Sequence, residues 1–168
     1  VAAILRSARL AECNDAMAAM YGYARAEEFI GARLDALMPD DERTRRTLGS
    51  LVASGFRLVD QETREIDRLG HVRIFINNMV GVIEDGRLKH VWGTQRDVTE
   101  RRRAEQALAD AEAQLRAIFE LAGVGMAKVS LDGRFVLVNP GLCRLLGRTE
   151  SELVSGLTFI DVTHPDDR

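Results

Sequence analysis

The sequence is poor in cysteine and aromatic residues, and it contains no long apolar run. Two cysteines in 168 positions are too few for a disulfide framework. Aromatic residues make up only 5% of the chain. Neither Cys13 nor Cys143 has the spacing of a metal-binding or redox motif, which favours a reducing compartment. Apolar stretches such as 79–83 are far shorter than the roughly 18 residues that cross a bilayer. We therefore expect a cytoplasmic chain that inserts into no membrane.

The chain also lacks a strong charge of either sign. Its 23 basic and 26 acidic residues give a net charge of -3, too small to attract nucleic acid or an anionic membrane, so we expect neither as a partner. Hydrophobic residues at 46% and charged residues at 29% exclude a disordered chain. The common nucleophile and phosphate-binding motifs are absent as well. We expect no enzyme activity within these residues.

An internal repeat organises what is present. Residues 9–43 align with residues 134–168 at a constant offset of 125 positions, without a gap. The matched residues are Asn14/Asn139, Gly22/Gly147, Glu27/Glu152, Gly31/Gly156, Asp41/Asp166 and Arg43/Arg168. This register indicates a duplicated domain. We expect one nearly whole domain over 1–98, a connecting helix over 99–122, and the N-terminal part of a second, truncated domain over 123–168.

Hydrophobic periodicity and the positions of glycine and proline predict an α+β fold for the first copy. The predicted strands are 1–5, 9–14, 56–67, 72–84 and 88–98, and the predicted helices are 15–21, 25–30 and 42–53. Asp40 or Asp41 is expected to cap the last of these helices. The Asp85-Gly86 pair is a strong hairpin signal between the last two strands. We expect these elements to form a five-stranded antiparallel sheet with short helices.

Alternation along the strand 72–84 predicts which of its faces lies in the core. One face carries Val72, Ile74, Ile76, Asn78, Val80 and Val82, and the other carries Arg73, Phe75, Asn77, Met79 and Gly81. The first set is the more uniformly aliphatic, so we predict that it points inward. Phe75 then points outward, and Asn78 is the one inward polar group, which needs a hydrogen-bond partner.

Several motifs connect these elements to a known family. They are the strand that ends at Asn14, the Gly22-Tyr23 step, the runs 27–31 and 77–81, and the run 92–101, Trp-Gly-Thr-Gln-Arg-Asp-Val-Thr-Glu-Arg. In these motifs the chain resembles a PAS domain with its C-terminal PAC half, and residues 125–168 resemble the beginning of a second PAS domain. The resemblance implies a PAS-like sheet with short helices on one face, followed by a signalling helix. It also implies a bacterial sensor whose downstream output domain lies in the same parent chain, typically the histidine kinase of a two-component system or a cyclic-dinucleotide enzyme.

The predicted connecting helix carries a heptad pattern. Its apolar positions are Ala104, Leu108, Ala111, Leu115, Ile118 and Ala122, at steps of 4, 3, 4, 3 and 4. We predict that Leu108 and Leu115 transmit the signal through a coiled-coil-like contact in a homodimer. The alternative is an amphipathic helix that folds back on its own sheet.

The corner at residues 97–99 is expected to couple the last strand to this helix. We predict that Asp97 pairs with a nearby basic side chain and that Thr99 fixes the start of the helix, so that a shift of the strand redirects the helix. Simple helix capping is the alternative role for these two residues.

The resemblance also suggests where a ligand would bind. It places Gly93 and Gln95 inward on the last strand, and with Ile76 and Asn78 they form the candidate ligand site. Trp92 points outward in this arrangement. We predict that Trp92 and Phe75 contribute to a dimer interface.

No cofactor is assigned from the sequence. Gln95 stands where flavin-binding light-sensing relatives carry an inward glutamine, but residues 32–46 lack the cysteine that forms their covalent adduct. Residues 40–54 lack the histidine that ligates haem in other relatives. We therefore predict a sensory module for a small ligand, a redox signal or a protein signal. A ligand-free dimerisation scaffold and a sensor with non-covalent flavin are the alternatives.

Overall fold

The computed structural model describes residues 2–167, so Val1 and Arg168 lie outside the described residues. The chain forms two compact units, residues 1–104 and residues 105–168. No helix within residues 2–167 is both long and apolar enough to cross a membrane.

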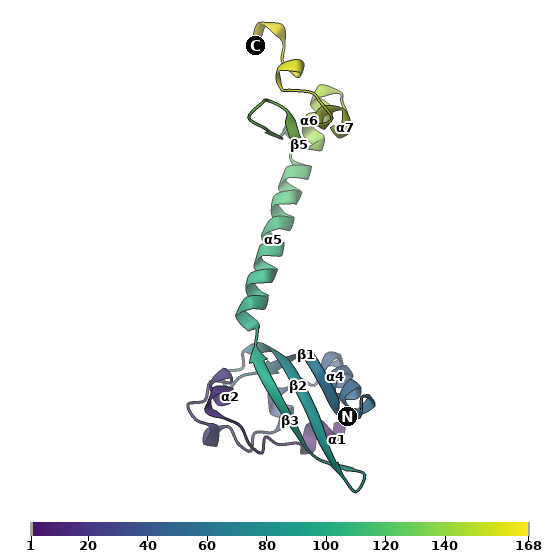
Figure 1. Ribbon diagram of the computed structural model, residues 1–168. Helices are drawn as coiled ribbons and strands as arrows, with labels where there is room; N and C mark the ends of the chain where they lie inside the picture. Colours follow the sequence, from purple (N-terminus) through teal and green to yellow (C-terminus); the bar gives the residue numbers. More distant parts are fainter. Residues whose placement is uncertain (1, 168) are drawn as a thin grey trace. The chain divides into compact units, whose positions relative to one another are not determined.

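The first unit places a three-stranded antiparallel sheet beside short helices (Figure 1). Its strands are β1 (Arg57–Ile66), β2 (Val72–Glu84) and β3 (Arg87–Asp97), in the spatial order β1-β2-β3. The helices are α1 (Ala2–Ser7), α2 (Asp15–Met20), η1 (Ala26–Glu28), α3 (Leu34–Leu37) and α4 (Glu42–Ala53). This is an α+β arrangement of the PAS-like kind that the sequence predicts, but its sheet has three strands rather than five.

The two predicted N-terminal strands account for the difference. Residues 2–7 form helix α1, because their alanine, leucine and arginine residues favour a helix and because Leu5 packs against Met38, Leu48 and Leu51 in the core. The segment 9–14 makes only an isolated bridge between Arg9 and Arg33. The prediction of strands at 1–5 and 9–14 is therefore wrong in the first unit.

Two local predictions in this unit are confirmed. Helix α4 has the predicted bounds, and its N-cap Asp41 accepts a hydrogen bond from the Thr44 amide at 2.8 Å. Asp85 and Gly86 both have positive φ, 50° and 71°, as the two central residues of a type I′ hairpin require. Both features depend on residues that are neighbours in sequence.

The core face of β2 is the reverse of the predicted one. Phe75 is completely buried and stacks on Tyr21 with ring centroids 5.1 Å apart, and Tyr21 in turn packs on Phe29 at 4.5 Å. The aliphatic residues of the opposite face lie on the outer side of the sheet, where Val80 is 46% exposed. The aromatic cluster decides the face because it buries more surface than a branched aliphatic side chain does.

The second unit contains the rest of helix α5 (Thr99–Leu121), a short hairpin and a group of helices. The strands are β4 (Ala127–Val129) and β5 (Phe135–Val138), and the helices are α6 (Pro140–Leu146), α7 (Glu150–Val154), η2 (Ile160–Val162) and η3 (Pro165–Asp167). Phe135, Val138 and Leu153 form its buried core.

The repeat seen in the sequence has a physical counterpart in helix capping. Asn14 accepts a hydrogen bond from the Met17 amide at 2.9 Å and caps α2. At the matching position, Asn139 accepts one from the Leu142 amide at 2.8 Å and caps α6. The shared asparagine therefore has the same local function in both units.

Candidate functional site at the junction of strand β3 and helix α5

The four residues predicted to bind a ligand do not share one face of the sheet. In the β2–β3 register, Gln95 lies opposite Asn77 and Gly93 lies opposite Met79, so both belong to the core face. Ile76 and Asn78 belong to the outer face, where the side chain of Asn78 accepts a hydrogen bond from the Asp60 amide at 3.0 Å. The predicted ligand set is therefore divided between two sides of the sheet.

Gly93 is explained by the approach of the neighbouring strand. A Cβ atom at this position would lie 2.7 Å from the backbone oxygen of Asn78 and 3.3 Å from Cγ of Met79. Any larger residue would push the two strands apart, which accounts for the glycine without a ligand.

Gln95 belongs to a buried polar cluster with Glu65, Tyr21, Thr63 and Asn77. The amide of Gln95 donates to Glu65 at 3.0 Å, and the Thr63 hydroxyl donates to Glu65 at 2.7 Å. The Tyr21 hydroxyl donates a short hydrogen bond to the same carboxyl group and lies 3.1 Å from the amide oxygen of Gln95. Asn77 completes the cluster by donating to Thr63 at 2.6 Å. The inward-pointing side chain of Gln95 thus binds the carboxyl group of Glu65.

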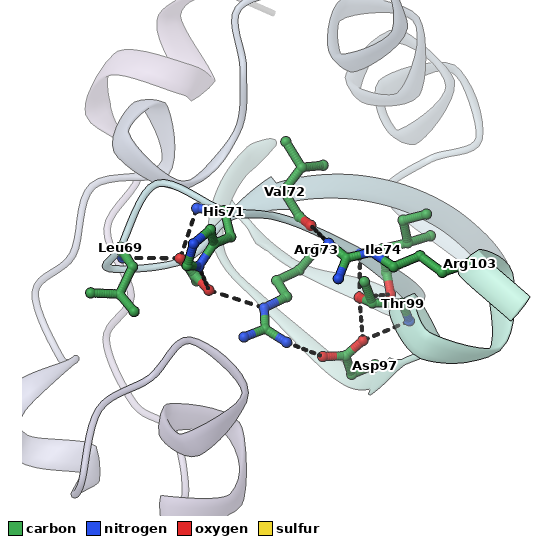
Figure 2. Close-up of polar contacts among 9 residues, drawn as sticks. Leu69, His71, Val72, Arg73, Ile74, Asp97, Thr99 and Arg103 are labelled. Atoms are coloured by element: carbon green, nitrogen blue, oxygen red, sulfur yellow. Dashed lines mark hydrogen bonds and ion pairs between the residues drawn. The ribbon is translucent and has the colours of Figure 1, made fainter.

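Thr99 links the end of β3 to the neighbouring strand and to the start of α5 (Figure 2). Its hydroxyl accepts a hydrogen bond from the Ile74 amide of β2 at 2.9 Å and donates a short one to Asp97. The Thr99 amide donates to the same carboxylate oxygen of Asp97 at 2.8 Å. Because Thr99 is only 2% exposed, these bonds are not shared with solvent. The first residue of α5 is therefore held by both β2 and β3.

Arg73 extends this junction to the turn that begins β2. Its guanidinium donates to Asp67 at 3.0 Å and lies 3.7 Å from the carboxylate of Asp97. Figure 2 shows the Arg73 side chain directed toward Asp97. Asp67 also accepts from the backbone amides of Leu69 and His71, both at 2.9 Å. Burial by itself would raise the pKa of Asp67. The backbone donors and the Arg73 guanidinium outweigh burial and lower that pKa to about 2.

The first turn of α5 has further ties to the sheet. Arg102 forms an ion pair with Glu62 of β1 at 2.7 Å, and Glu62 also pairs with Arg43 of α4 at 3.0 Å. Arg103 donates to the backbone oxygen of Val72 at 3.5 Å. These contacts are solvent-exposed and individually weak, but they restrain the same turn that Thr99 holds.

The predicted signalling residues fall into two groups. Asp97 and Thr99 meet at the junction, and the basic partner predicted for Asp97 is Arg73. Leu108 and Leu115 are 62% and 68% exposed on α5.

The two predicted interface residues also differ in position. Trp92 is 53% exposed on the outer face of the sheet, where its ring meets that of His90 edge to face. Phe75 is completely buried and cannot form part of an interface, which corrects the sequence prediction.

Sequence reasoning missed Tyr21, Glu65, Asp67 and Arg73. Asp67 begins the run Asp-Arg-Leu-Gly, whose turn composition could have indicated that its side chain caps backbone amides. Glu65 gives no such signal, since a glutamate that alternates with other polar residues on a strand normally points to solvent. Only the packing of α2 against the sheet buries it.

Comparisons with known proteins cover both units. A family model described as a PAS domain matches residues 3–100, and one described as a PAS fold matches residues 113–168. Over 66 residues the chain is 38% identical to the probable diguanylate cyclase DgcE of Escherichia coli, a match that covers 39% of this chain and 6% of that protein. This chain thus spans a small part of that relative.

Two solved structures are also similar to the chain. One is an RNA-binding light-oxygen-voltage receptor, with 29% identity and a TM-score of 0.45 over 60% of this chain and 29% of that one. The other is a sensory box histidine kinase/response regulator from Burkholderia thailandensis, with 26% identity and a TM-score of 0.44 over 58% of this chain and 75% of that one.

Proposed function

Because the chain belongs to the PAS domain family, we propose that residues 1–98 are a sensory module whose conformational state reaches α5 through the junction of Asp97 and Thr99. The observation that carries this proposal is the buried hydroxyl of Thr99, which joins β2, β3 and the first residue of α5. A displacement of β3 relative to β2 cannot keep both hydrogen bonds of this hydroxyl. The helix start must then move with one strand or lose contact with the other.

The tests of this proposal begin with Thr99→Val. This substitution keeps the shape of the side chain but leaves the Ile74 amide without its partner and one oxygen of Asp97 with only the backbone amide of Thr99. We expect the free energy of unfolding to fall by about 1 to 3 kcal/mol, the usual cost of unsatisfied buried groups. We also expect faster amide exchange at Ile74 and in the first turn of α5. Amide exchange followed by NMR measures both effects.

Thr94→Val is the matched control, because Thr94 is exposed on the outer face of β3. It should leave exchange at Ile74 and in α5 unchanged. If Thr99→Val also leaves the exchange of the first turn unchanged, the junction does not restrain the helix and the proposed route of transmission is wrong.

We further propose that α5 pairs with α5 of a second chain and so carries the signal as a two-helix element. The exposed side chains of Leu108, Leu115 and Ile118 support this, because they repeat at heptad spacing along one stripe of the helix. Trp92 remains a candidate contact on the outer face of the sheet. Two chains thus form a homodimer, with residues 99–122 as the signalling helix of each.

We expect Leu108→Glu and Leu115→Glu each to weaken self-association at least tenfold, since a charge would be buried in the seam between the helices. Analytical ultracentrifugation over a concentration series measures this effect. Ala113→Glu, which places the same charge away from the stripe, should leave the association constant nearly unchanged. Equal sedimentation of all these variants and the wild type would contradict pairing through α5.

The proposal includes no cofactor and no catalytic step in these residues. An absorption spectrum of the purified chain with flavin bands would support the flavin alternative instead.

The output domain is proposed to be a histidine kinase elsewhere in the parent chain. The name of the Escherichia coli relative makes a diguanylate cyclase the second candidate. A cytoplasmic location stays a prediction.

A further inference from the structure

The carboxyl group of Glu65 is the most unusual polar group in the first unit. It is 6% exposed, and it lies beside the aromatic cluster of Tyr21, Phe29 and Phe75. Its hydrogen bonds come from the hydroxyls of Tyr21 and Thr63 and from the amide of Gln95, all of which are neutral groups. A buried carboxylate without a cation among its hydrogen-bond partners is costly, and it is retained at the expense of stability.

The charged groups around Glu65 are engaged elsewhere. Arg73 lies directly across from it in the β1–β2 register, but its guanidinium bonds to Asp67 and faces Asp97. From the helical side, α2 and η1 contribute Tyr21 and the apolar Ala18 and Phe29. Asp15 of α2 caps the Ala26 amide, and Glu27 and Glu28 of η1 are exposed to solvent. No compensating charge therefore reaches Glu65 from the described elements that pack against it.

The charge state of Glu65 determines the direction of its hydrogen bonds. As a carboxylate it accepts all three bonds. As a carboxylic acid it must donate one, and its nearest acceptor is the Tyr21 hydroxyl oxygen, whose own proton can then go to the amide oxygen of Gln95 at 3.1 Å. Protonation therefore moves the Tyr21 hydrogen bond from Glu65 to Gln95.

Gln95 lies two residues before Asp97 on the same face of β3. A change in the hydrogen bonds of its side chain changes what holds β3 to β1 immediately beside the junction with α5. We propose that Glu65, Tyr21 and Gln95 form a proton-responsive switch that adjusts the end of β3 and thereby the start of α5. This inference rests on the proposed function, because it names what regulates the same junction.

The electrostatics agree with this geometry. Burial raises the pKa of Glu65, and its hydrogen bonds with Tyr21, Thr63 and Gln95 only partly oppose burial. A raised pKa in the folded state means that the stabilising contribution of Glu65 is complete below the pKa of the unfolded chain and is lost as the pH rises through the folded pKa. The transition therefore lies above the ordinary range of a glutamate.

The test is a pH titration of the full chain between pH 4 and pH 8, with the protonation of Glu65 read from its infrared carboxyl band. Amide protection at Gln95 and Thr99, corrected for intrinsic exchange, is measured in parallel. We expect protection at both amides to change with the same midpoint as the carboxyl band. Glu65→Gln, which is always neutral, should abolish this dependence, and Glu84→Gln on the exposed end of β2 should preserve it.

Tyr21→Phe provides a second variant that keeps the aromatic stacking. It removes one donor to the carboxylate, so the midpoint should rise by about one pH unit, the size expected for the loss of one hydrogen bond to a charged group. A full wild-type pH response in Glu65→Gln would overturn the switch. A carboxyl group that titrates while the amides of Gln95 and Thr99 stay unchanged would also overturn it.

These outcomes separate the switch from the proposed function. If Thr99→Val leaves α5 undisturbed, transmission through the junction fails, while the titration of Glu65 would still be visible at Gln95. If Thr99→Val loosens α5 but Glu65 does not affect Gln95, the junction stands without this regulator.

Discussion

Phe75→Ala should lower the free energy of unfolding of the first unit by about 3 to 5 kcal/mol, the usual cost of removing a buried aromatic ring. Phe75 is completely buried, and its ring stacks on Tyr21. The resulting cavity would also loosen the support of Tyr21, whose hydroxyl belongs to the Glu65 cluster. Chemical denaturation followed by circular dichroism measures the effect.

Ile76→Ala is the matched control on the same strand. Ile76 lies on the outer face and is only partly buried, so this variant should lose much less stability than Phe75→Ala. The sequence pattern alone predicts the opposite ranking, because it places Ile76 in the core. A larger loss for Ile76→Ala than for Phe75→Ala would mean that the observed face of β2 is wrong.

Asp67→Asn should remove an acid-sensitive part of the stability of the first unit. The pKa of Asp67 is lowered to about 2 in the folded chain, so its stabilising contribution is present above the unfolded pKa of 3.8 and is lost as the pH falls toward 2. We expect this contribution to be about 1 to 2 kcal/mol near neutral pH. It is smaller than the full shift implies because its partners His71 and Arg73 are 62% and 33% exposed and partly screened by solvent.

Melting temperatures of the wild type and Asp67→Asn between pH 2 and pH 7 measure this contribution. The two curves should converge toward pH 2 and separate above pH 4. Asp35→Asn is the control, since Asp35 forms a comparable arginine pair with Arg33 on a more exposed surface and should change the curve little. Parallel curves for wild type and Asp67→Asn would show that the ionised Asp67 carboxylate does not contribute to the junction.

The junction is a network of ion pairs and hydrogen bonds rather than a single helix cap. It is formed by Asp67, Arg73, Asp97 and Thr99. Loss of the Asp67 charge frees Arg73 to move toward Asp97 alone, which would change the contact that orients the start of α5. We therefore expect Asp67→Asn to alter amide exchange at Thr99 as well as stability. An unchanged Thr99 amide would limit the role of Asp67 to the turn before β2.

Some parts of the site were predictable because their signals are local. Asp97 and Thr99 are two residues apart at a change from strand to helix, where short polar side chains reach nearby backbone amides. The α4 boundaries and the Asp85-Gly86 turn are of the same kind. In each case the partner lies within a few residues, so the pattern contains both halves of the interaction.

The sequence by itself determined these local features, the repeat and the direct passage from β3 into α5. Only the tertiary structure decided that residues 2–7 form a helix, that β2 turns Phe75 inward, and that Glu65 and Asp67 are buried. The physical reason is that both faces of β2 carry enough apolar residues to line a core. The stacking of Tyr21 on Phe75 selects the inner face of β2. Glu65 is bonded by Tyr21 and Gln95, which are 44 and 30 positions away from it in sequence and meet it only when the chain folds.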